Sequence, residues 1–187
     1  DNLSNSSVES LTRVQELAQK NLNFVEGDIR NSETLDQVFK KFKIDAVIHF
    51  AGLKAVGESQ QIPLTYFDNN IAGSISLVQA MERAQVFNVV FSSSATVYDE
   101  ANISPLNEDM PTGMPTNNYG YTKLIVEQLL QKLAIADARW SIALLRYFNP
   151  VGAHKSGRIG EDPQGIPNNL MPFVTQVAVG RREKLSI

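Results

Sequence analysis

Apolar residues recur along this chain at two spacings, which together predict alternating helices and strands. Repeats every three or four positions predict five helices, over residues 8–18, 32–42, 63–78, 119–133 and 170–179. Short apolar runs predict five strands, over residues 23–26, 45–50, 88–91, 141–147 and 185–187. This alternation is typical of an α/β fold with a parallel sheet.

Polar residues at the predicted helix starts suggest how the helices begin. Ser7 and Ser32 are the expected N-caps of the first two helices, because a serine hydroxyl accepts from a free backbone N–H. Pro63 is expected to open the third helix. The inner face of that third helix is expected to carry Leu64, Phe67, Ile71, Ile75 and Val78.

Polar or glycine-rich sequence follows three of the predicted strands, at residues 52–54, residues 92–94 and Asn149. The carboxyl ends of parallel strands meet at one edge of a sheet, and ligands bind there. We therefore expect these segments to converge on one site. Residues 105–115 are rich in proline and predict a surface loop, and residues 151–169 predict a long functional loop.

Tyr119 and Lys123 lie four residues apart at the start of a predicted helix, so they share one face. A phenol titrates near ~10, and an ammonium close by favours the phenolate and lowers that pKa. The pair is a candidate general base that can also return the proton. Alone, such a pair is more often a solvated turn, and Ser92-Ser93-Ser94 at a strand end gives it weight.

Composition narrows the classes of function. The chain has 187 residues, a net charge of −3 and no cysteine. Nothing therefore suggests nucleic acid or an anionic membrane surface, and thiolate catalysis, disulfides and thiolate metal sites are excluded. No apolar run approaches the ~20 residues of a membrane span. The chain begins at Asp1 rather than at methionine, so we expect a fragment of a longer protein.

Both histidines and the paired arginines have ordinary explanations. His49 lies inside an apolar strand and is expected to be a satisfied core histidine. His154 is expected to be a loop residue, and Arg181-Arg182 a solvated helix end, with a role near phosphate as the alternative.

Four blocks, residues 45–59, 92–98, 119–123 and 146–153, together resemble the UDP-glucose 4-epimerases, a family within the extended short-chain dehydrogenase/reductase superfamily. The resemblance continues through residues 160–182. Tyr-x₃-Lys is common to the superfamily, whereas the blocks at residues 50–59 and 167–172 are much more specific.

The resemblance implies a tightly held NAD that is reduced and reoxidised within one turnover of UDP-glucose or UDP-galactose. Tyr119 would take the proton of the sugar 4-hydroxyl. Lys123 would lower the pKa of Tyr119 and hold the nicotinamide ribose, and Ser94 would hydrogen-bond the same hydroxyl. A 4-keto sugar would turn over in the pocket before the hydride returns to its other face.

The family's binding residues carry over by motif. Besides Ser94, Tyr119 and Lys123, the cofactor-binding residues would be Asp1, Asn2, Asp28, Ile29, Phe50, Ala51, Gly52, Leu53, Lys54, Asn69 and Phe148. The substrate-binding residues would be Lys54, Ser94, Tyr119, Asn149, Asn169 and Leu170. A carboxylate after the second strand, here Asp1, accepts from both ribose hydroxyls and favours NAD over NADP, although a terminal aspartate is more often simply solvated.

The resemblance also implies a Rossmann-like doubly wound parallel sheet. Residues 1–150 would form the NAD-binding domain, and residues 151–187 would begin a smaller UDP-sugar-binding region. The family's first two strands and its Gly-x-x-Gly-x-x-Gly phosphate loop are not in this sequence. We therefore expect an incomplete sheet with two empty central positions, and no turnover by this chain alone. The family implies a cytoplasmic homodimer by analogy.

Three alternatives differ in chemistry. A sugar-nucleotide 4,6-dehydratase needs an Asp-Glu pair after the serine, and Ala95 and Thr96 stand there instead, which argues against dehydration. An epimerase for UDP-N-acetylhexosamines stays open, because we expect the residues that select the sugar beyond Ile187. A non-catalytic protein that binds NAD or a nucleotide sugar would have little reason to keep the tyrosine, lysine and serine together.

Overall fold

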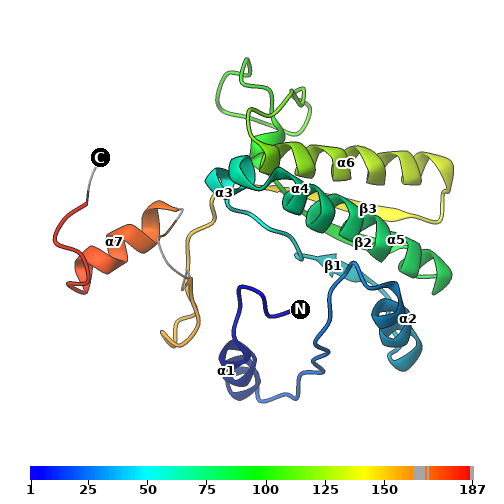
Figure 1. The fold of residues 1–187 in the computed structure, drawn as a ribbon, viewed down its shortest axis with the longest axis horizontal. Coiled ribbons are helices and arrows are strands. Elements are labelled where there is room, and N and C mark those ends of the chain that lie inside the picture. Colours follow the sequence, from blue (N-terminus) through cyan, green and yellow to red (C-terminus); the bar gives the residue numbers. More distant parts are fainter. Residues whose placement is uncertain (162–166, 168, 186–187) are drawn as a thin grey trace. The chain divides into compact units, whose positions relative to one another are not determined.

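The structure, a computed structural model, describes residues 1–161, 167 and 169–185 of the chain, which form two compact units (Figure 1). The first unit comprises Asp1 and residues 27–148. The second comprises residues 2–26 and the described part of residues 149–187. No helix among the described residues combines the length and the apolar character needed to cross a membrane.

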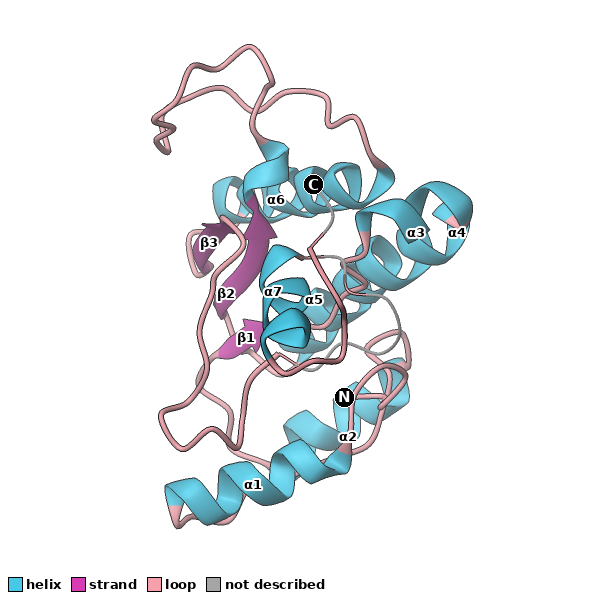
Figure 2. Ribbon diagram, turned by 90° about the vertical axis from the view of Figure 1, so that its left-hand side faces the viewer, coloured by secondary structure: helices cyan, strands magenta, loops and turns pink. Residues whose placement is uncertain are grey.

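A parallel three-stranded sheet, in the order β1-β2-β3, forms the centre of the first unit (Figure 2). Its strands are β1 (Val47–His49), β2 (Asn88–Ser94) and β3 (Ser141–Tyr147). The prediction of an α/β fold with a parallel sheet is confirmed. β2 runs further than expected, because Ser92, Ser93 and Ser94 still pair with β3. The serine triplet is therefore the carboxyl end of the strand rather than the turn after it.

The described part of the first unit also contains seven helical segments. In chain order they are α2 (Ser32–Lys41), α3 (Val56–Gln61), α4 (Pro63–Tyr66), the π-helical η1 (Phe67–Ala72), α5 (Gly73–Arg83), the short 3₁₀ segment η2 (Ala95–Val97) and α6 (Asn118–Ala136). α5 and α6 run in the same direction beside β2 and β3 (Figure 1). Residues 105–115 form no helix and no named strand, which confirms the loop expected there.

The core lies between the sheet and these two helices. It is built from Leu77, Val78 and Met81 of α5, Val89 and Phe91 of β2, Val126 and Leu130 of α6, and Val86 and Trp140 from the connections. Burial of such side chains is worth about 1.5–3 kcal/mol each. Ile48 on the opposite face is 63% exposed. The prediction that β1 is covered on both faces is therefore wrong within the described residues.

The third predicted helix runs from Pro63 to Arg83 but contains a π-helical turn, which the periodicity did not reveal. The predicted inner face is wrong at two positions. Leu64, which precedes the π-helical turn, is 84% exposed. Ile75, which follows that turn, is 38% exposed, because the extra residue in the turn rotates the face after it. The buried positions include the polar residue Asn70.

One predicted cap and one predicted strand are also wrong. Asn31, not Ser32, caps α2, because its Oδ1 accepts from the backbone N–H of Thr34 at 3.0 Å. Residues 23–26 form no strand, because they have no ladder partner among the described residues.

The second unit contains α1 (Val8–Ala18) and α7 (Leu170–Ala178), both at the predicted places. Ser7 caps α1 as expected, accepting from the backbone N–H of Glu9 at 3.2 Å. Arg13 of α1 donates to the carbonyl oxygen of Arg158 at 3.1 Å, which ties the helix to the loop after residue 149. A strand is predicted over residues 185–187, of which residues 186 and 187 lie outside the described residues.

Candidate functional site

The start of α6 is held against the end of β2 by local contacts that fix Tyr119. Asn117 caps the helix by accepting from the backbone N–H of Gly120 at 2.8 Å. A Cβ at Gly120 would lie 2.9 Å from Pro115 Cβ and 3.0 Å from Thr96 Oγ1, so only glycine allows this close approach. The Tyr119 N–H donates to Ser59 Oγ at 3.1 Å. The backbone at Tyr119 therefore has little freedom.

Tyr119 and Ser94 are brought together as predicted. A side-chain hydrogen bond joins the phenol to Ser94, and Ser94 is itself 8% exposed. Thr96 Oγ1 donates to Ser94 Oγ at 3.0 Å, which leaves the serine hydrogen free to point elsewhere. Burial raises the pKa of Tyr119, and the hydrogen bond with Ser94 opposes that rise.

Lys123 reaches the same place from the next turn of α6. Its side chain is buried, and Nζ donates to the carbonyl oxygen of Ser92 at 2.7 Å. Nζ lies 4.8 Å from the ring centroid of Phe91 and 5.8 Å from that of Tyr119. Burial lowers the pKa of Lys123 to about 8. The ammonium is therefore still mostly charged at pH 7, beside the phenol ring.

One physical expectation is wrong for this chain by itself. The sequence predicts that Lys123 lowers the pKa of Tyr119, whereas burial raises that pKa and Lys123 is not among the causes of the shift. Desolvation opposes the charged form of both groups, and at this separation it outweighs their mutual attraction. The resting form of Tyr119 is the neutral phenol.

Asn70 is a site residue that the sequence analysis missed. It lies in the π-helical turn, is 4% exposed, and donates through Nδ2 to the Leu53 carbonyl and to Thr122 Oγ1, both at 3.0 Å. Its Oδ1 accepts from the Leu53 N–H at 2.8 Å and from Asn69 Nδ2 at 2.9 Å. An amide on the inner face of an otherwise apolar helix was the available signal. Asn70 joins the loop after β1 to the start of α6.

The loop after β1 carries the predicted residues Phe50, Ala51, Gly52, Leu53 and Lys54. A Cβ at Gly52 would meet Asn70 Oδ1 at 3.4 Å and Lys123 Nζ at 3.6 Å, so Gly52 directly borders Lys123 and Asn70. Phe50 is 63% exposed, and its ring lies 6.5 Å from that of Tyr147. Ala51 and Lys54 are exposed as well.

Phe148 lies at the end of β3 and is 59% exposed, with its ring 6.2 Å from that of Tyr98. A hollow of about 490 Å³ adjoins it, lined by Tyr98, Leu106, Asn107, Glu108 and residues 144–148. Exposed aromatic rings and a hollow thus meet at the carboxyl end of the sheet.

Asp28 and Ile29 occupy the corner before α2. Asp28 forms an ion pair with Arg30 at 2.7 Å, and Arg30 also bridges to Asp68 of η1 at 2.6 Å. A Cβ at Gly73 would lie 2.6 Å from Ile29 Cδ1, so the absence of a side chain there lets this corner sit against the long helix. The Asp1 carbonyl accepts from the Gly27 N–H at 3.0 Å, which attaches Asp1 to the same corner.

Four predicted residues belong to the second unit. Asn2 accepts from the Ser4 N–H at 3.2 Å, and Asn169 donates to Glu161 Oε1 at 3.2 Å just before α7. Leu170 opens α7 and is 65% exposed. Asn149 has a φ of 34°, in the left-handed region that asparagine tolerates better than most residues. Their roles toward cofactor and substrate stay predictions.

His49 is buried as expected but only partly satisfied. Its Nε2 lies 2.8 Å from Ser74 Oγ, whereas Nδ1 is buried without a hydrogen-bond partner in the part of the chain that the structure describes. Burial, with a contribution from the charge of Lys123, lowers the pKa of His49 to about 4. His49 is therefore a neutral core residue at pH 7.

Residues 2–186 match the NAD dependent epimerase/dehydratase family, and the chain belongs to that family. A UDP-glucose 4-epimerase of Bacillus subtilis is 61% identical over 187 residues, which are the whole of this chain and 55% of the relative. The chain thus spans about half the length of the curated relatives it matches.

Solved structures agree with this assignment. A UDP-glucose 4-epimerase from Bifidobacterium longum, in complex with NAD+ and UDP, superposes with a TM-score of 0.95 at 49% identity, covering 98% of this chain and 55% of that one. The UDP-Glc/GlcNAc 4-epimerase from Campylobacter jejuni gives a TM-score of 0.81 at 31% identity, covering 99% and 55%. The chain therefore has the Rossmann-like α/β fold of these epimerases.

Proposed function

We propose that this chain forms the catalytic centre of a UDP-glucose 4-epimerase, which interconverts UDP-glucose and UDP-galactose. The observation that carries the proposal is the cluster at the end of β2. Tyr119 is hydrogen-bonded to Ser94, and Lys123 Nζ lies 5.8 Å from the phenol ring. The 61% identity to an epimerase of Bacillus subtilis supports the reaction named.

The protein at work would be longer than this chain, with the flanking segments that its relatives carry. In this proposal the three strands belong to a larger doubly wound sheet. The 63% exposure of Ile48 and the 39% exposure of Leu145 support it, because apolar side chains on a parallel sheet are normally covered. The activity, its substrates and a homodimeric state are proposed for that full-length protein.

The residues in the first unit fit a bound NAD. The loop after β1 approaches Lys123 without a side chain at Gly52, and the exposed rings of Phe50 and Phe148 offer apolar surface for a nicotinamide. NAD, when bound, supplies the acceptor and donor for a hydride at sugar C4. Asp1, Asp28, Ile29, Asn69 and the Phe50–Lys54 loop would hold it. The pyrophosphate would need a glycine-rich loop from the flanking sequence.

The proton steps fall to this chain's own side chains. Tyr119 would take the proton of the sugar 4-hydroxyl and later return it to the same oxygen. Ser94 would orient that hydroxyl, because it already touches the phenol. The phenol rests neutral, so its basic form depends on Lys123 keeping its charge nearby. In the second unit, Asn149, Asn169 and Leu170 would bind the UDP-sugar.

Dehydration is disfavoured at this site. In a 4,6-dehydratase, an acid and a base would stand directly after the serine, where this chain has Ala95 and Thr96. The Thr96 hydroxyl is already used, because it donates to Ser94 Oγ at 3.0 Å. The Campylobacter jejuni relative, whose name includes both UDP-Glc and GlcNAc, keeps the N-acetylated sugar as the second candidate substrate.

The test is to incubate the full-length protein with UDP-galactose and without added NAD, and to follow UDP-glucose formation. We expect conversion, with NAD released from the protein on denaturation. UDP-N-acetylgalactosamine as a second substrate separates the two epimerase specificities. NAD bound without turnover of either sugar would favour a non-catalytic binding protein, and a 4-keto-6-deoxy product would identify a dehydratase.

A further inference from the structure

Glu127 is a buried carboxylate that the proposed proton steps leave unexplained. Its side chain is 1% exposed and lies on α6, four residues after Lys123 and eight after Tyr119. Residues at this spacing share one face of a helix. Tyr119, Lys123 and Glu127 therefore occupy three successive turns on the face that packs against β2.

The Glu127 carboxylate binds side chains of two strands at once. Ser93 Oγ of β2 donates to Oε1 at 2.5 Å. Arg146 of β3 donates through Nη2 to Oε2 at 2.8 Å and through Nε to Oε1 at 3.1 Å. Ser93 and Arg146 are register partners in the sheet. One side chain of α6 thus fixes the helix to both strands beneath it.

This anchor adjoins the contact that holds Lys123. Lys123 Nζ donates to the carbonyl oxygen of Ser92, and the next residue, Ser93, donates to Glu127. Consecutive residues of β2 therefore hold consecutive turns of α6. The Arg146 guanidinium carbon also lies 4.7 Å from the Tyr98 ring centroid, and Tyr98 contacts Phe148 at the edge of the proposed cofactor site.

A contribution to stability does not by itself explain why Glu127 and Arg146 form a buried ion pair. Replacing a buried ion pair by apolar side chains of similar volume is often neutral or stabilising, whereas removing one partner is strongly destabilising. What charged and bidentate hydrogen bonds add is a fixed geometry. In this chain that geometry sets how deep α6 sits and how it is rotated about its axis.

We propose that Glu127 is a positioning residue for the Tyr119–Lys123 pair, acting together with Ser93 and Arg146. It holds α6 at the depth and rotation that keep Lys123 on the Ser92 carbonyl and the phenol on Ser94. This inference rests on the proposed function, because the placement of the pair matters only if the pair does the chemistry.

The test uses the full-length protein and three variants. Glu127→Gln keeps the shape but leaves the Arg146 charge unpaired. The double variant Glu127→Gln/Arg146→Gln restores a neutral hydrogen-bonded network. Asp36→Asn is the matched control, because the pair of Asp36 with Arg83, 2.8 Å apart, also joins two elements but lies exposed between α2 and α5. Each is measured for kcat, KM, the pH dependence of kcat, NAD content and thermal midpoint.

We expect Glu127→Gln to lower kcat by about 10- to 100-fold, the scale of a small misplacement of a catalytic group, with little change in KM. The pH dependence of kcat should also shift in this variant, because Lys123 would lose its hydrogen bond to the Ser92 carbonyl and become less buried. The double variant should recover most of the lost kcat, and Asp36→Asn should behave as wild type.

Two results would overturn the proposal. One is wild-type kcat and an unshifted pH profile in Glu127→Gln protein that is folded and loaded with NAD. The other is a folded double variant with kcat as low as the single variant. If the single variant does not fold, the double variant decides alone, because it leaves no unpaired charge. Near wild-type kcat in the folded double variant then supports the proposal, and a kcat about 10- to 100-fold lower overturns it. Absence of epimerisation by the wild-type protein would instead reject the proposed function.

Discussion

Replacing Lys123 by methionine separates what this side chain does for catalysis from what its burial costs. Burial lowers the pKa of Lys123 from 10.5 to about 8, and that difference corresponds to about 3 kcal/mol against the buried charge. Methionine keeps most of the apolar stem against Phe91 but removes the donor to the Ser92 carbonyl, which costs about 1 kcal/mol. We therefore expect Lys123→Met to stabilise the full-length protein at pH 7 by about 2 kcal/mol.

The sign of the pH dependence follows from the same values. The folded pKa of Lys123, about 8, lies below its unfolded value of 10.5, so between these values the unfolded state binds more protons than the native state. The stability of the wild-type protein therefore rises with pH across this window relative to the variant. The advantage of Lys123→Met should be complete below pH 8 and should fade toward pH 10.5.

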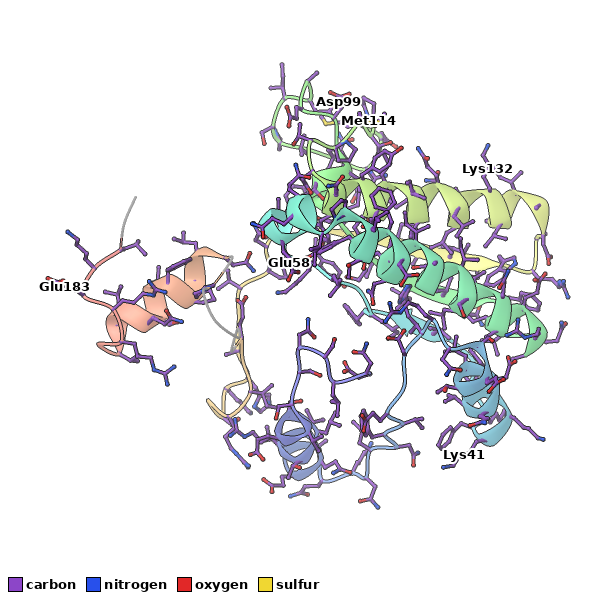
Figure 3. All side chains as sticks on the ribbon, viewed as in Figure 1. Lys41, Glu58, Asp99, Met114, Lys132 and Glu183 are labelled. Atoms are coloured by element: carbon purple, nitrogen blue, oxygen red, sulfur yellow. The ribbon has the colours of Figure 1, made fainter. Side chains whose placement is uncertain are left out.

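The same substitution should cost activity. We expect kcat to fall by about 10²- to 10⁴-fold, the usual contribution of general acid–base help, because the phenolate loses its neighbouring charge. Lys132→Met is the matched control, since Lys132 is exposed on the outer side of the same helix and points away from the strands (Figure 3). Thermal unfolding at matched NAD content, repeated from pH 7 to pH 10.5, and epimerase assays measure both effects.

The reasoning is refuted if Lys123→Met is less stable than wild type by the same amount at every pH. Such a result would mean that the ammonium is stabilised by its surroundings rather than desolvated. Unchanged kcat in the folded variant would remove Lys123 from the chemistry.

Three further outcomes follow from the structure. Tyr119→Phe should lose about 10²- to 10⁴-fold in kcat while keeping NAD, and Tyr121→Phe, two residues along the same helix, should not; equal rates would remove Tyr119 from the mechanism. Because the folded pKa of His49, about 4, lies below its ordinary 6.5, wild-type stability should fall as pH drops from 6.5 toward 4. In acid unfolding curves, His49→Gln should remove about 2–3 kcal/mol of this decrease in the free energy of unfolding, and His154→Gln is the control. Gly120→Ala should lower the thermal midpoint by overpacking worth about 1–3 kcal/mol, because its Cβ would lie 2.9 Å from a proline side chain; an unchanged midpoint would mean that the start of α6 can shift freely.

Local patterns predicted those elements whose type follows from the spacing of their own apolar residues. β3 occupies residues 141–147 as predicted, and α1 and α7 lie where apolar periodicity placed them. That residues 52–54 and 92–94 lie at one edge of the sheet was expected from one topological rule, that the carboxyl ends of parallel strands share an edge, whereas the pairing of Ser94 with Tyr119 was implied by the family resemblance.

What the sequence did not predict depends on partners rather than on local pattern. Residues 23–26 are apolar enough for a strand, but a strand exists only when another strand pairs with it. The π-helical turn at Phe67–Ala72 is also invisible to a search for repeats of three and four, so the buried Asn70 within it and the exposed Ile75 after it were misjudged. The direction of the pKa shift of Tyr119 could be predicted only from the structure, because burial of the phenol is its largest cause.

The face of α6 that packs on the sheet combines these themes. Where a core helix usually carries apolar residues, this face carries Tyr119, Thr122, Lys123 and Glu127, the last three buried. Each polar group buried there must be hydrogen-bonded, since an unsatisfied one costs about 1–3 kcal/mol. Each of the three buried groups has a partner on the backbone or on a neighbouring side chain. An apolar face would pack at least as well, so burial alone does not account for this pattern. Placement of a phenol and an ammonium at the end of β2 does account for it, which is why we locate the chemistry on α6.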